Sequence, residues 1–349
     1  MRRAKWHHLG HDRCTVPIYE ASSPRGVVPL LKTLMSSYCT NDCKFCMFRS
    51  SRRIDRYRWE PEELTRIAIH LWEMKKIKGL FLSSSFEGDP DETVERQLET
   101  VRMLRRDGFT GYIHLRLMPG TGTEKIKESM TLCDRIGINI EFPNKELYEE
   151  MKGGPIDFSQ DVMKRMEQIS RIARKECQAD VDTQIVVGIE DYDDEILEKT
   201  EWLYKKLNLA RVYYSGFEPI PETPLENHPP CPKLRELRLY QTSFLLRDYG
   251  FKLNDVIFDG KGMLPVDEDP KFLAAKTADL FLNINEASYL DLLRVPGIGP
   301  VSAIKILKER PLRDEKRLRS IGVNLKRARP FIFLKGTQKT LVNEKVYTP

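Results

Sequence analysis

The chain has 349 residues, of which 31% are charged and 40% apolar, and its formal net charge is +5. This length allows one large domain and a second small one. The polar N-terminus lacks the apolar core of a secretory signal. The most apolar early run, residues 26–35, is too short to span a membrane. We therefore expect a globular cytoplasmic protein with no membrane partner.

Six short apolar runs alternate with amphipathic stretches in the first two thirds of the chain. The runs cover residues 29–35, 79–84, 112–118, 137–142, 182–188 and 210–217. Between them lie helical patterns such as residues 60–76, where apolar residues recur at helical spacing after a proline. This alternation predicts a parallel sheet with helices on its outer face. Both an open doubly wound sheet and a partial barrel fit, and either places its chemistry at the carboxyl ends of the strands.

Three of the seven cysteines, Cys39, Cys43 and Cys46, lie directly after the first predicted strand. An odd, clustered set favours reduced thiols that bind metal over a disulfide framework. Three thiolates can hold three corners of a [4Fe–4S] cluster and leave one iron open. The alternative is zinc, although no second CxxC or spaced histidine pair is present. Its fourth ligand would come from His7, His8, His11 or Cys14.

The spacing Cx3CxxC, with Phe45 before the last cysteine and a β-strand before the first, resembles the signature of the radical S-adenosylmethionine superfamily. The resemblance implies a partial (β/α)6 TIM-type barrel and a [4Fe–4S] cluster whose open iron binds S-adenosylmethionine. Phe45 would contact the adenine. An electron from an external donor, such as a flavodoxin or ferredoxin, would then cleave the cofactor to a 5′-deoxyadenosyl radical.

Two polar segments at strand ends match further cofactor contacts of that superfamily. The segment "SSSFEG" stands where the superfamily has a Gly-Gly-Glu segment, so the resemblance assigns Ser84, Ser85 and Glu87 to the amino group of the cofactor. Asn139 and Glu141 fall on one face of the fourth strand by the period of two, where a carboxylate suits the ribose hydroxyls. A barrel-lining ion pair with an arginine is the alternative for Glu141.

Three other features have two interpretations each. Gln184, on the fifth strand, is either a site residue or a satisfied interior amide. The arginine-rich stretch 47–58 is either a solvated collar or a surface that steers a polyanion. Cys231 is either a hydrogen-atom donor or an ordinary loop thiol.

The C-terminal part of the chain has a different character. A helix is predicted over residues 234–250, and the segment 259–270, rich in glycine, proline and acidic residues, marks a domain boundary. Residues 271–349 contain 16 Lys/Arg against 7 Asp/Glu, a net charge of +9, whereas residues 1–270 carry −4. A basic C-terminal domain on a slightly acidic body indicates a polyanionic partner, or else a solvated basic surface.

Residues 285–310 predict two short helices joined by the tight turn "PGIG". Glycine allows positive φ and close backbone approach, and the start of the second helix offers free N–H groups to a phosphate. This resembles the helix–hairpin–helix motif, which grips nucleic acid without reading its sequence, and residues 318–332 resemble a degenerate second copy. An ordinary helical corner is the alternative. The expected nucleic-acid contacts are Gly297, Ile298, Gly299, Ser302, Lys305 and Lys308.

From about residue 28 to 335 the chain resembles DNA modification or repair radical S-adenosylmethionine proteins with a C-terminal helix–hairpin–helix. The resemblance rests on "LLKTLMSSYCTNDCKFC", "DRIGINIEFPN", "RVYYSGFEPIPETPLE" and "LLRVPGIGP". It implies an N-terminal extension (1–27), the barrel (28–262), an all-α DNA-binding domain (271–335) and a tail (336–349). No catalytic residue or substrate is implied. Alternatives are action on RNA or a DNA-bound protein, and a non-catalytic iron–sulfur redox sensor that binds DNA.

Overall fold

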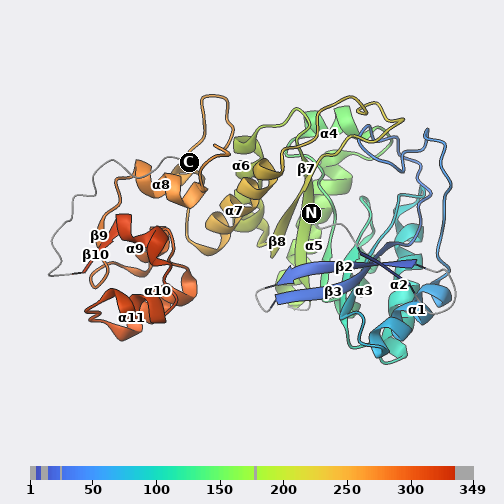
Figure 1. The fold of residues 1–349 in the computed structure, drawn as a ribbon. Helices are drawn as coiled ribbons and strands as arrows, with labels where there is room; N and C mark the ends of the chain where they lie inside the picture. Colours follow the sequence, from blue (N-terminus) through green and yellow to red (C-terminus); the bar gives the residue numbers. More distant parts are fainter. Residues whose placement is uncertain (1–4, 9–14, 24–25, 177–178, 335–349) are drawn as a thin grey trace. The chain divides into compact units, whose positions relative to one another are not determined.

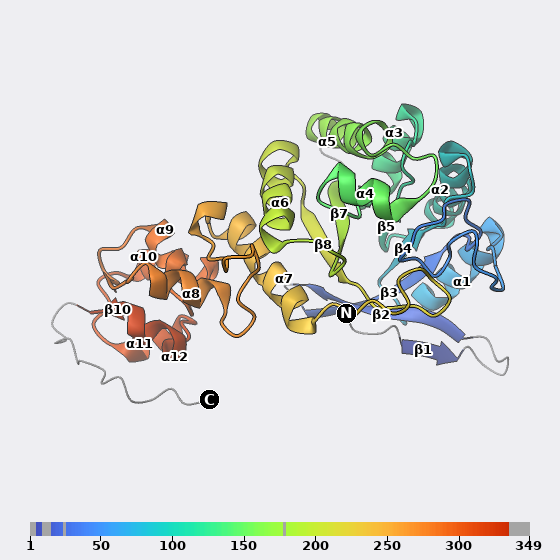
Figure 2. The same cartoon turned by 90° about the horizontal axis from the view of Figure 1, so that it is seen from above.

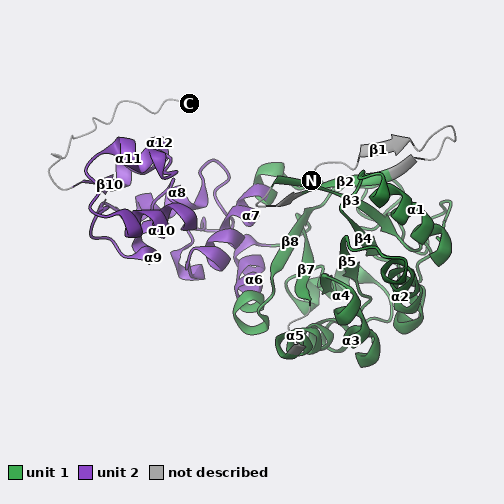
Figure 3. Cartoon of the chain, turned by 90° about the horizontal axis from the view of Figure 1, so that it is seen from below, with its two compact units in different colours: residues 1–191, 202–236 green, residues 192–201, 237–349 purple. Residues whose placement is uncertain are grey.

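The computed structural model describes residues 5–8, 15–23, 26–176 and 179–334. The chain divides into two compact units, coloured separately in Figure 3. Unit 1 consists of residues 1–191 and 202–236, and unit 2 of residues 192–201 and 237–349. The divisions fall inside helices α6 (Asp193–Leu207) and α7 (Lys233–Asp248), upstream of the glycine- and proline-rich segment 259–270. Both helices contribute to both units.

Unit 1 is built on a sheet of eight described strands whose spatial order follows the sequence (Figure 1). The strands are β1 (Lys5–His8), β2 (Thr15–Ser23), β3 (Gly26–Leu34), β4 (Gly79–Ser83), β5 (Tyr112–Arg116), β6 (Arg135–Gly137), β7 (Asp180–Val187) and β8 (Arg211–Gly216). Strands β3 to β8 pair in parallel, which confirms the six predicted strand–helix units. Strands β1 and β2 add an antiparallel edge to β3, in the region predicted only as an N-terminal extension.

One predicted strand is displaced. The apolar run 137–142 is expected to form the fourth parallel strand, but β6 ends at Gly137 and only one further bridge, from Glu141 to Ile185, joins the chain to β7. Residues 138–140 leave the ladder, and the chain rejoins β7 at Glu141, whose N–H donates to the Gln184 carbonyl (3.0 Å) and whose carbonyl accepts from the Val186 N–H (2.7 Å). Glu141 itself has φ +58, in the left-handed region.

The helices of unit 1 cover the outer face of the curved sheet (Figure 2). They are α1 (Pro61–Glu73), α2 (Pro90–Arg106), α3 (Thr123–Leu132), α4 (Lys145–Lys152), a π-helical turn (Phe158–Met163) and α5 (Lys164–Glu176). Helix α1 shows why the sequence folds this way. Leu64, Ala68 and Leu71, at helical spacing, are fully buried, and Pro61 starts the helix. Helix α4, which the periodicity did not predict, ends at Gly153 with φ +52.

Unit 2 is mainly helical, with one pair of two-residue strands among its described residues. Its elements are a 3₁₀ turn (Leu253–Asp255), α8 (Pro270–Thr277), β9 (Leu282–Asn283), α9 (Tyr289–Arg294), α10 (Pro300–Glu309), α11 (Glu315–Ser320), α12 (Leu325–Ala328), a second 3₁₀ turn (Arg329–Phe331) and β10 (Ile332–Phe333). Leu292, Ile298, Ile306 and Leu318 belong to one buried aliphatic cluster. The two helices predicted on either side of "PGIG" are α9 and α10. The predicted tail, residues 336–349, lies outside the described residues.

None of the helices in the described part of the chain has both the length and the apolar composition needed to cross a bilayer.

Candidate functional site: the cysteine loop and the barrel cavity

The three clustered cysteines lie in a folded loop between β3 and α1. Asp42 accepts hydrogen bonds from Arg49 (Nε–Oδ1 2.9 Å) and from the Ser51 hydroxyl (2.7 Å), which closes the loop. Arg56 donates to the carbonyls of Ser37 (2.6 Å) and Arg49 (2.7 Å). Arg49 and Arg56 of the stretch 47–58 therefore hold the loop together, while Arg53 and Arg58 are exposed.

The loop rests on the end of helix α4. The Lys44 N–H donates to the Met151 carbonyl (2.8 Å). A Cβ at Gly154, which has φ +123, would lie only 2.5 Å from the Asn41 side-chain oxygen. Glycine is favoured at this position because L-residues rarely adopt this φ. This packing places Lys152, the last residue of α4, beside the cysteines.

The donor set suits an iron–sulfur cluster. Cys43 is buried, while Cys39 and Cys46 are partly exposed. Burial raises the pKa of Cys43 to about 12 and also raises that of Cys46, and the Lys152 charge opposes both shifts. Burial thus favours the neutral thiol, whereas a coordinated thiol is deprotonated outright. A neighbouring cation favours that thiolate state.

A single metal ion fits less well. In the part of the chain that the structure describes, no three His, Cys, Asp or Glu side chains are grouped closely enough to hold one ion. A polynuclear cluster does not need such a group, because each cysteine binds a different iron. The proposed N-terminal zinc ligands lie among residues whose side chains are outside the described set, so the zinc interpretation gains no support.

The segment that follows β4 packs against the cysteine loop. The Ser85 N–H donates to the Ser36 carbonyl (2.9 Å), and the Thr40 N–H donates to the Phe86 carbonyl (2.8 Å). The Ser84 hydroxyl is buried and has no hydrogen-bond partner among the described residues. A buried, unsatisfied hydroxyl beside the cysteine loop is what a cofactor contact would leave in the protein alone. Glu87 instead forms an ion pair with Arg58.

The side chains of Asn139 and Glu141 meet, although β6 ends before both residues. The Asn139 side-chain N–H donates to Glu141 Oε1 (3.1 Å), and Lys152 Nζ lies 3.9 Å from the same oxygen. The Asn139 side-chain oxygen is buried without a described partner. The ion pair expected as the alternative for Glu141 therefore exists, but with a lysine and not an arginine. After the Ser84 hydroxyl, the Asn139 side-chain oxygen is thus a second buried oxygen available to a polar ligand.

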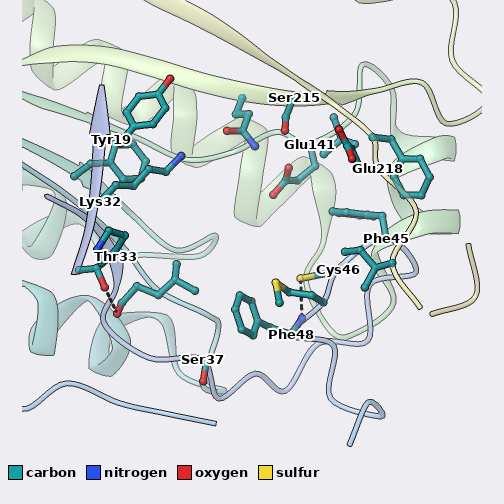
Figure 4. Close-up of a pocket in the computed structure, with 18 of the residues that line it drawn as sticks. Tyr19, Lys32, Thr33, Ser37, Phe45, Cys46, Phe48, Glu141, Ser215 and Glu218 are labelled. Atoms are coloured by element: carbon teal, nitrogen blue, oxygen red, sulfur yellow. Dashed lines mark hydrogen bonds between the residues drawn. The ribbon is translucent and has the colours of Figure 1, made fainter. Parts of the chain in front are cut away.

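A cavity of about 1470 Å³ runs from the cysteine loop into the barrel (Figure 4). Phe45, Cys46, Glu141 and Gln184 all line it, which brings together residues from three separate segments of the sequence. The Phe45 ring meets the Phe142 ring edge to face, with centroids 5.4 Å apart. Ligand pockets usually measure about 300–1000 Å³, so this cavity has room for more than one ligand.

Cys231 also lines the cavity. Its N–H donates to the Phe217 carbonyl (2.8 Å). A Cβ at Gly188, which has φ +99, would come within 2.5 Å of the Cys231 Cβ. The loop that carries this thiol is thus held tightly against the end of β7.

Below the cavity, the barrel interior contains a buried charged network. Arg116 donates to Asp182 (2.6 Å), and His114 Nε2 lies 2.9 Å from the other Asp182 oxygen. Burial opposes ionisation of Asp182, but Arg116 and His114 outweigh it and hold the Asp182 pKa below its ordinary value. Burial lowers the His114 pKa. This network fills the barrel interior and is structural.

In unit 2, the "PGIG" turn is locked from two sides. Gly297 has φ +87, and a Cβ there would lie 2.4 Å from the Asn324 carbonyl oxygen. The Asn324 N–H donates to the Gly297 carbonyl (2.9 Å). The Ile298 side chain is buried, and its carbonyl accepts a hydrogen bond from Lys271 (2.6 Å). Ile298 therefore shapes the turn from inside.

The predicted phosphate contacts of unit 2 separate into two groups. Ser302 is buried, and its hydroxyl donates to the Ile321 carbonyl (3.5 Å). This side chain is therefore not available to a phosphate. Lys305 and Lys308 are exposed. Gly299 caps α10 without any side-chain hydrogen bond, which leaves the first-turn N–H groups of that helix open to a ligand.

Two cavity or loop residues of consequence, Lys32 and Lys152, were not predicted from the sequence. Lys32 lies inside strand β3, where the alternation of apolar and polar residues shows which face a side chain is on but not whether it lines a cavity. Lys152 is the last residue of a helix that the periodicity did not predict. The pair Gly153–Gly154 was the available signal, because two adjacent glycines after a helical stretch indicate close backbone approach.

Comparison with known proteins agrees with this geometry. The family model described as "Radical SAM superfamily" matches residues 33–203. A curated relative, an uncharacterized protein of Methanocaldococcus jannaschii, is 27% identical over 209 residues, which cover 56% of this chain and 50% of the relative. The chain therefore spans about half the length of this relative.

Two solved structures share the fold. One is the FeFe-hydrogenase maturase HydG from Carboxydothermus hydrogenoformans, with TM-score 0.53 and 17% identity over 62% of this chain and 51% of that one. The other is methylornithine synthase (PylB), with TM-score 0.51 and 19% identity over 63% of each chain. At these identities the likeness concerns the fold alone. Together with the matched family model, the three-cysteine loop and the six parallel strands, it identifies residues 33–203 as a domain of the radical SAM superfamily, whose cofactors are a [4Fe–4S] cluster and S-adenosylmethionine.

Proposed function

We propose that this protein is a radical S-adenosylmethionine enzyme that acts on DNA held by unit 2. Cys39, Cys43 and Cys46 would hold the cluster, while Phe45 and Glu141 would contact S-adenosylmethionine. When bound, these groups supply an electron-driven cleavage of the cofactor to a 5′-deoxyadenosyl radical, which abstracts hydrogen from the substrate. The electron would come from an external donor such as a flavodoxin or ferredoxin.

The protein's own residues supply position and exclusion of water. Asn139 and Lys152 hold the Glu141 carboxylate in one orientation. The close packing of the cysteine loop on α4 holds the loop in place, and Cys46 lines the cavity. The size of the cavity supports catalysis over a purely redox-sensing role, because a sensor needs no space for a second ligand beside its cofactor.

The "PGIG" turn carries the nucleic-acid part of the proposal. Its tight geometry leads directly into an uncapped helix start, and two exposed lysines follow on the same helix. Uncapped N–H groups at the positive end of a helix bind phosphate. The second turn, with Gly322 at φ +97, packs on the first through Ser302. Two such turns side by side fit a helix–hairpin–helix pair that grips a phosphate backbone.

DNA binding is tested by salt titration of the full-length protein with duplex DNA, single strands and structured RNA. Each phosphate contact contributes about 0.9 to the slope of log K against log salt. We expect Lys305→Ala with Lys308→Ala to lower that slope by about 1–2. The control is Lys276→Ala, an exposed lysine of α8 that is paired with Glu268 (3.3 Å). Equal slopes for both variants would remove the hairpin from the proposal, and stronger binding of RNA would favour the RNA alternative.

Catalysis is tested by anaerobic reconstitution followed by dithionite and S-adenosylmethionine. We expect 5′-deoxyadenosine from the wild type and none from Cys43→Ala, which also loses the iron–sulfur absorbance. A cluster that forms without any 5′-deoxyadenosine would favour the redox-sensor alternative. Mass analysis of nucleosides from cells with and without the gene would then identify the modified or repaired base.

A further inference from the structure

A lysine inside the barrel lines the cavity on the side away from Glu141 (Figure 4). Lys32 is on β3, where it pairs in register with Phe81 of β4, and Phe81 pairs with His114 of β5. These residues lie in one layer across the strands. Lys32 is therefore a fixed feature of the barrel wall and not a mobile surface side chain.

Lys32 differs from its cationic neighbours in having no carboxylate. Arg116 is paired with Asp182 (2.6 Å), and Arg135 is paired with Asp180 (2.6 Å). Among the described residues, the contacts of the Lys32 ammonium are two aromatic rings: its Nζ lies 5.1 Å from the Tyr19 centroid and 5.0 Å from the Phe81 centroid.

The Lys32 side chain is half-buried, and the two rings recover only part of the hydration that its ammonium loses. Burial lowers the Lys32 pKa, and the like charge of Arg116 lowers it further. No carboxylate in the described part of the chain offsets these effects, so the ammonium can pair with an anion that enters the cavity.

Carboxylates lie across the cavity from Lys32. Figure 4 shows Glu141 and Glu218 there, and the lining as a whole also includes Asp55, Arg58, Glu63, Lys233 and Glu236. Burial and the nearby Glu218 charge raise the pKa of Glu236. Glu141 and Glu218 repel an anion near them, whereas the Lys32 ammonium attracts it. These three side chains therefore favour one direction for a ligand that carries an anion.

We propose that Lys32, with the Tyr19 and Phe81 rings beside it, binds an oxyanion of the substrate, a phosphate or a carboxylate, and so orients the substrate toward the cysteine loop. The inference goes beyond the DNA proposal, because it holds for any substrate with such a group. Only its phosphate form rests on a nucleotide substrate. Lys32 acts here as a substrate-binding residue, and its ammonium donates the hydrogen bonds.

The test is isothermal titration of the full-length protein loaded with cluster and S-adenosylmethionine. The probes are the four 2′-deoxynucleoside 5′-monophosphates, the matching deoxynucleosides without phosphate, and free amino acids as carboxylates. The variants are Lys32→Met and, as control, Lys233→Met, which removes an exposed lysine that also lines the cavity. A charge-assisted hydrogen bond predicts about 10- to 100-fold weaker binding of the anionic probe in Lys32→Met. The control should change it less than about threefold because an exposed charge is screened.

Each outcome is informative. Monophosphates that depend on Lys32 support the oxyanion site and the nucleotide substrate together. Amino acids that depend on Lys32, with no binding of monophosphates, support the oxyanion site and contradict the DNA substrate. Wild-type protein that binds no anionic probe, or equal losses in both variants, overturns the proposal.

A second measurement does not depend on the fold of a variant. Reductive methylation of the wild-type protein, followed by mass spectrometry of the peptide that contains Lys32, should be slowed at that residue by the bound probe. Lys233 should react at the same rate with and without the probe. Unchanged labelling of Lys32 under saturating probe would also refute the site.

Discussion

Gly297 offers the sharpest test of how the "PGIG" turn is built. Its φ of +87 lies in a region that L-residues rarely occupy, and an added Cβ would lie 2.4 Å from the backbone oxygen of Asn324. Forcing a side chain into such a conformation costs about 1–3 kcal/mol. The contact adds about 1–3 kcal/mol more, because it involves backbone that cannot rotate away. We expect Gly297→Ala to destabilise unit 2 by roughly 2–6 kcal/mol, a large part of the roughly 5–15 kcal/mol typical of a domain.

The chain provides both a control and an internal reference. Gly260, in the same unit, has no positive φ and no atom within 4 Å of the position that a Cβ would occupy, so Gly260→Ala should change stability by less than about 0.5 kcal/mol. All four tryptophans of the sequence, residues 6, 59, 72 and 202, fall within unit 1. Tryptophan fluorescence therefore follows unit 1 alone, while unit 2 needs a separate probe.

Hydrogen exchange with mass spectrometry supplies that probe. Peptides from residues 284–328 should exchange much faster in Gly297→Ala than in the wild type or in Gly260→Ala, because exchange follows the free energy of opening. The urea midpoint by tryptophan fluorescence should stay unchanged. If those peptides keep wild-type protection, the two turns are not locked together as described and do not form a rigid phosphate-binding pair.

Three further outcomes are expected. Lys152→Met should lower the reduction potential of the reconstituted cluster by tens of millivolts in an electrochemical titration, because a buried positive charge beside the cysteines stabilises the added electron. Lys44→Met should shift the potential much less, because the Lys44 ammonium is already paired with Glu150 (3.6 Å). Equal shifts would contradict this. Burial lowers the pKa of Lys271 to about 7, so the folded state binds fewer protons than the unfolded state between about pH 7 and 10.5. The stability of unit 2 should therefore rise with pH across that window by at most about 5 kcal/mol. Lys271→Met should flatten that rise in urea titrations, and a parallel pH profile would refute the assignment. Asp182→Asn should lower the free energy of unfolding of unit 1 by about 3–5 kcal/mol, because it leaves Arg116 buried without a counter-charge. Urea unfolding followed by tryptophan fluorescence measures this loss. A loss below about 1 kcal/mol would show that the pair is not needed for stability.

Local pattern was enough to predict the parallel sheet, whereas the partial barrel was implied only by the family resemblance, because the same pattern also fits an open sheet. Six apolar runs separated by amphipathic helices specify a parallel sheet, because only helical crossovers can connect parallel strands and cover their outer face. The pattern failed at the fourth strand, which ends at Gly137 although the apolar run continues to Phe142. The positive φ at Glu141, where the chain bridges to β7 again, is also not visible in the periodicity. The antiparallel β2 was missed for another reason: its pairing with β3 depends on the turn between them as well as on its own sequence.

The candidate site, like the fold, could be predicted from the sequence only in part. The three-cysteine loop and its position after a strand could be read from the chain alone, because ligand spacing and a β–loop–α order are local properties. The folded structure was needed to show that Lys152 lies beside the cysteines, that Lys32 has no carboxylate while Arg116 and Arg135 do, and that Ser302 is buried between two turns. Burial and charge pairing depend on residues far apart in the chain, so they are set when the strands close around the cavity and cannot be read from any one segment.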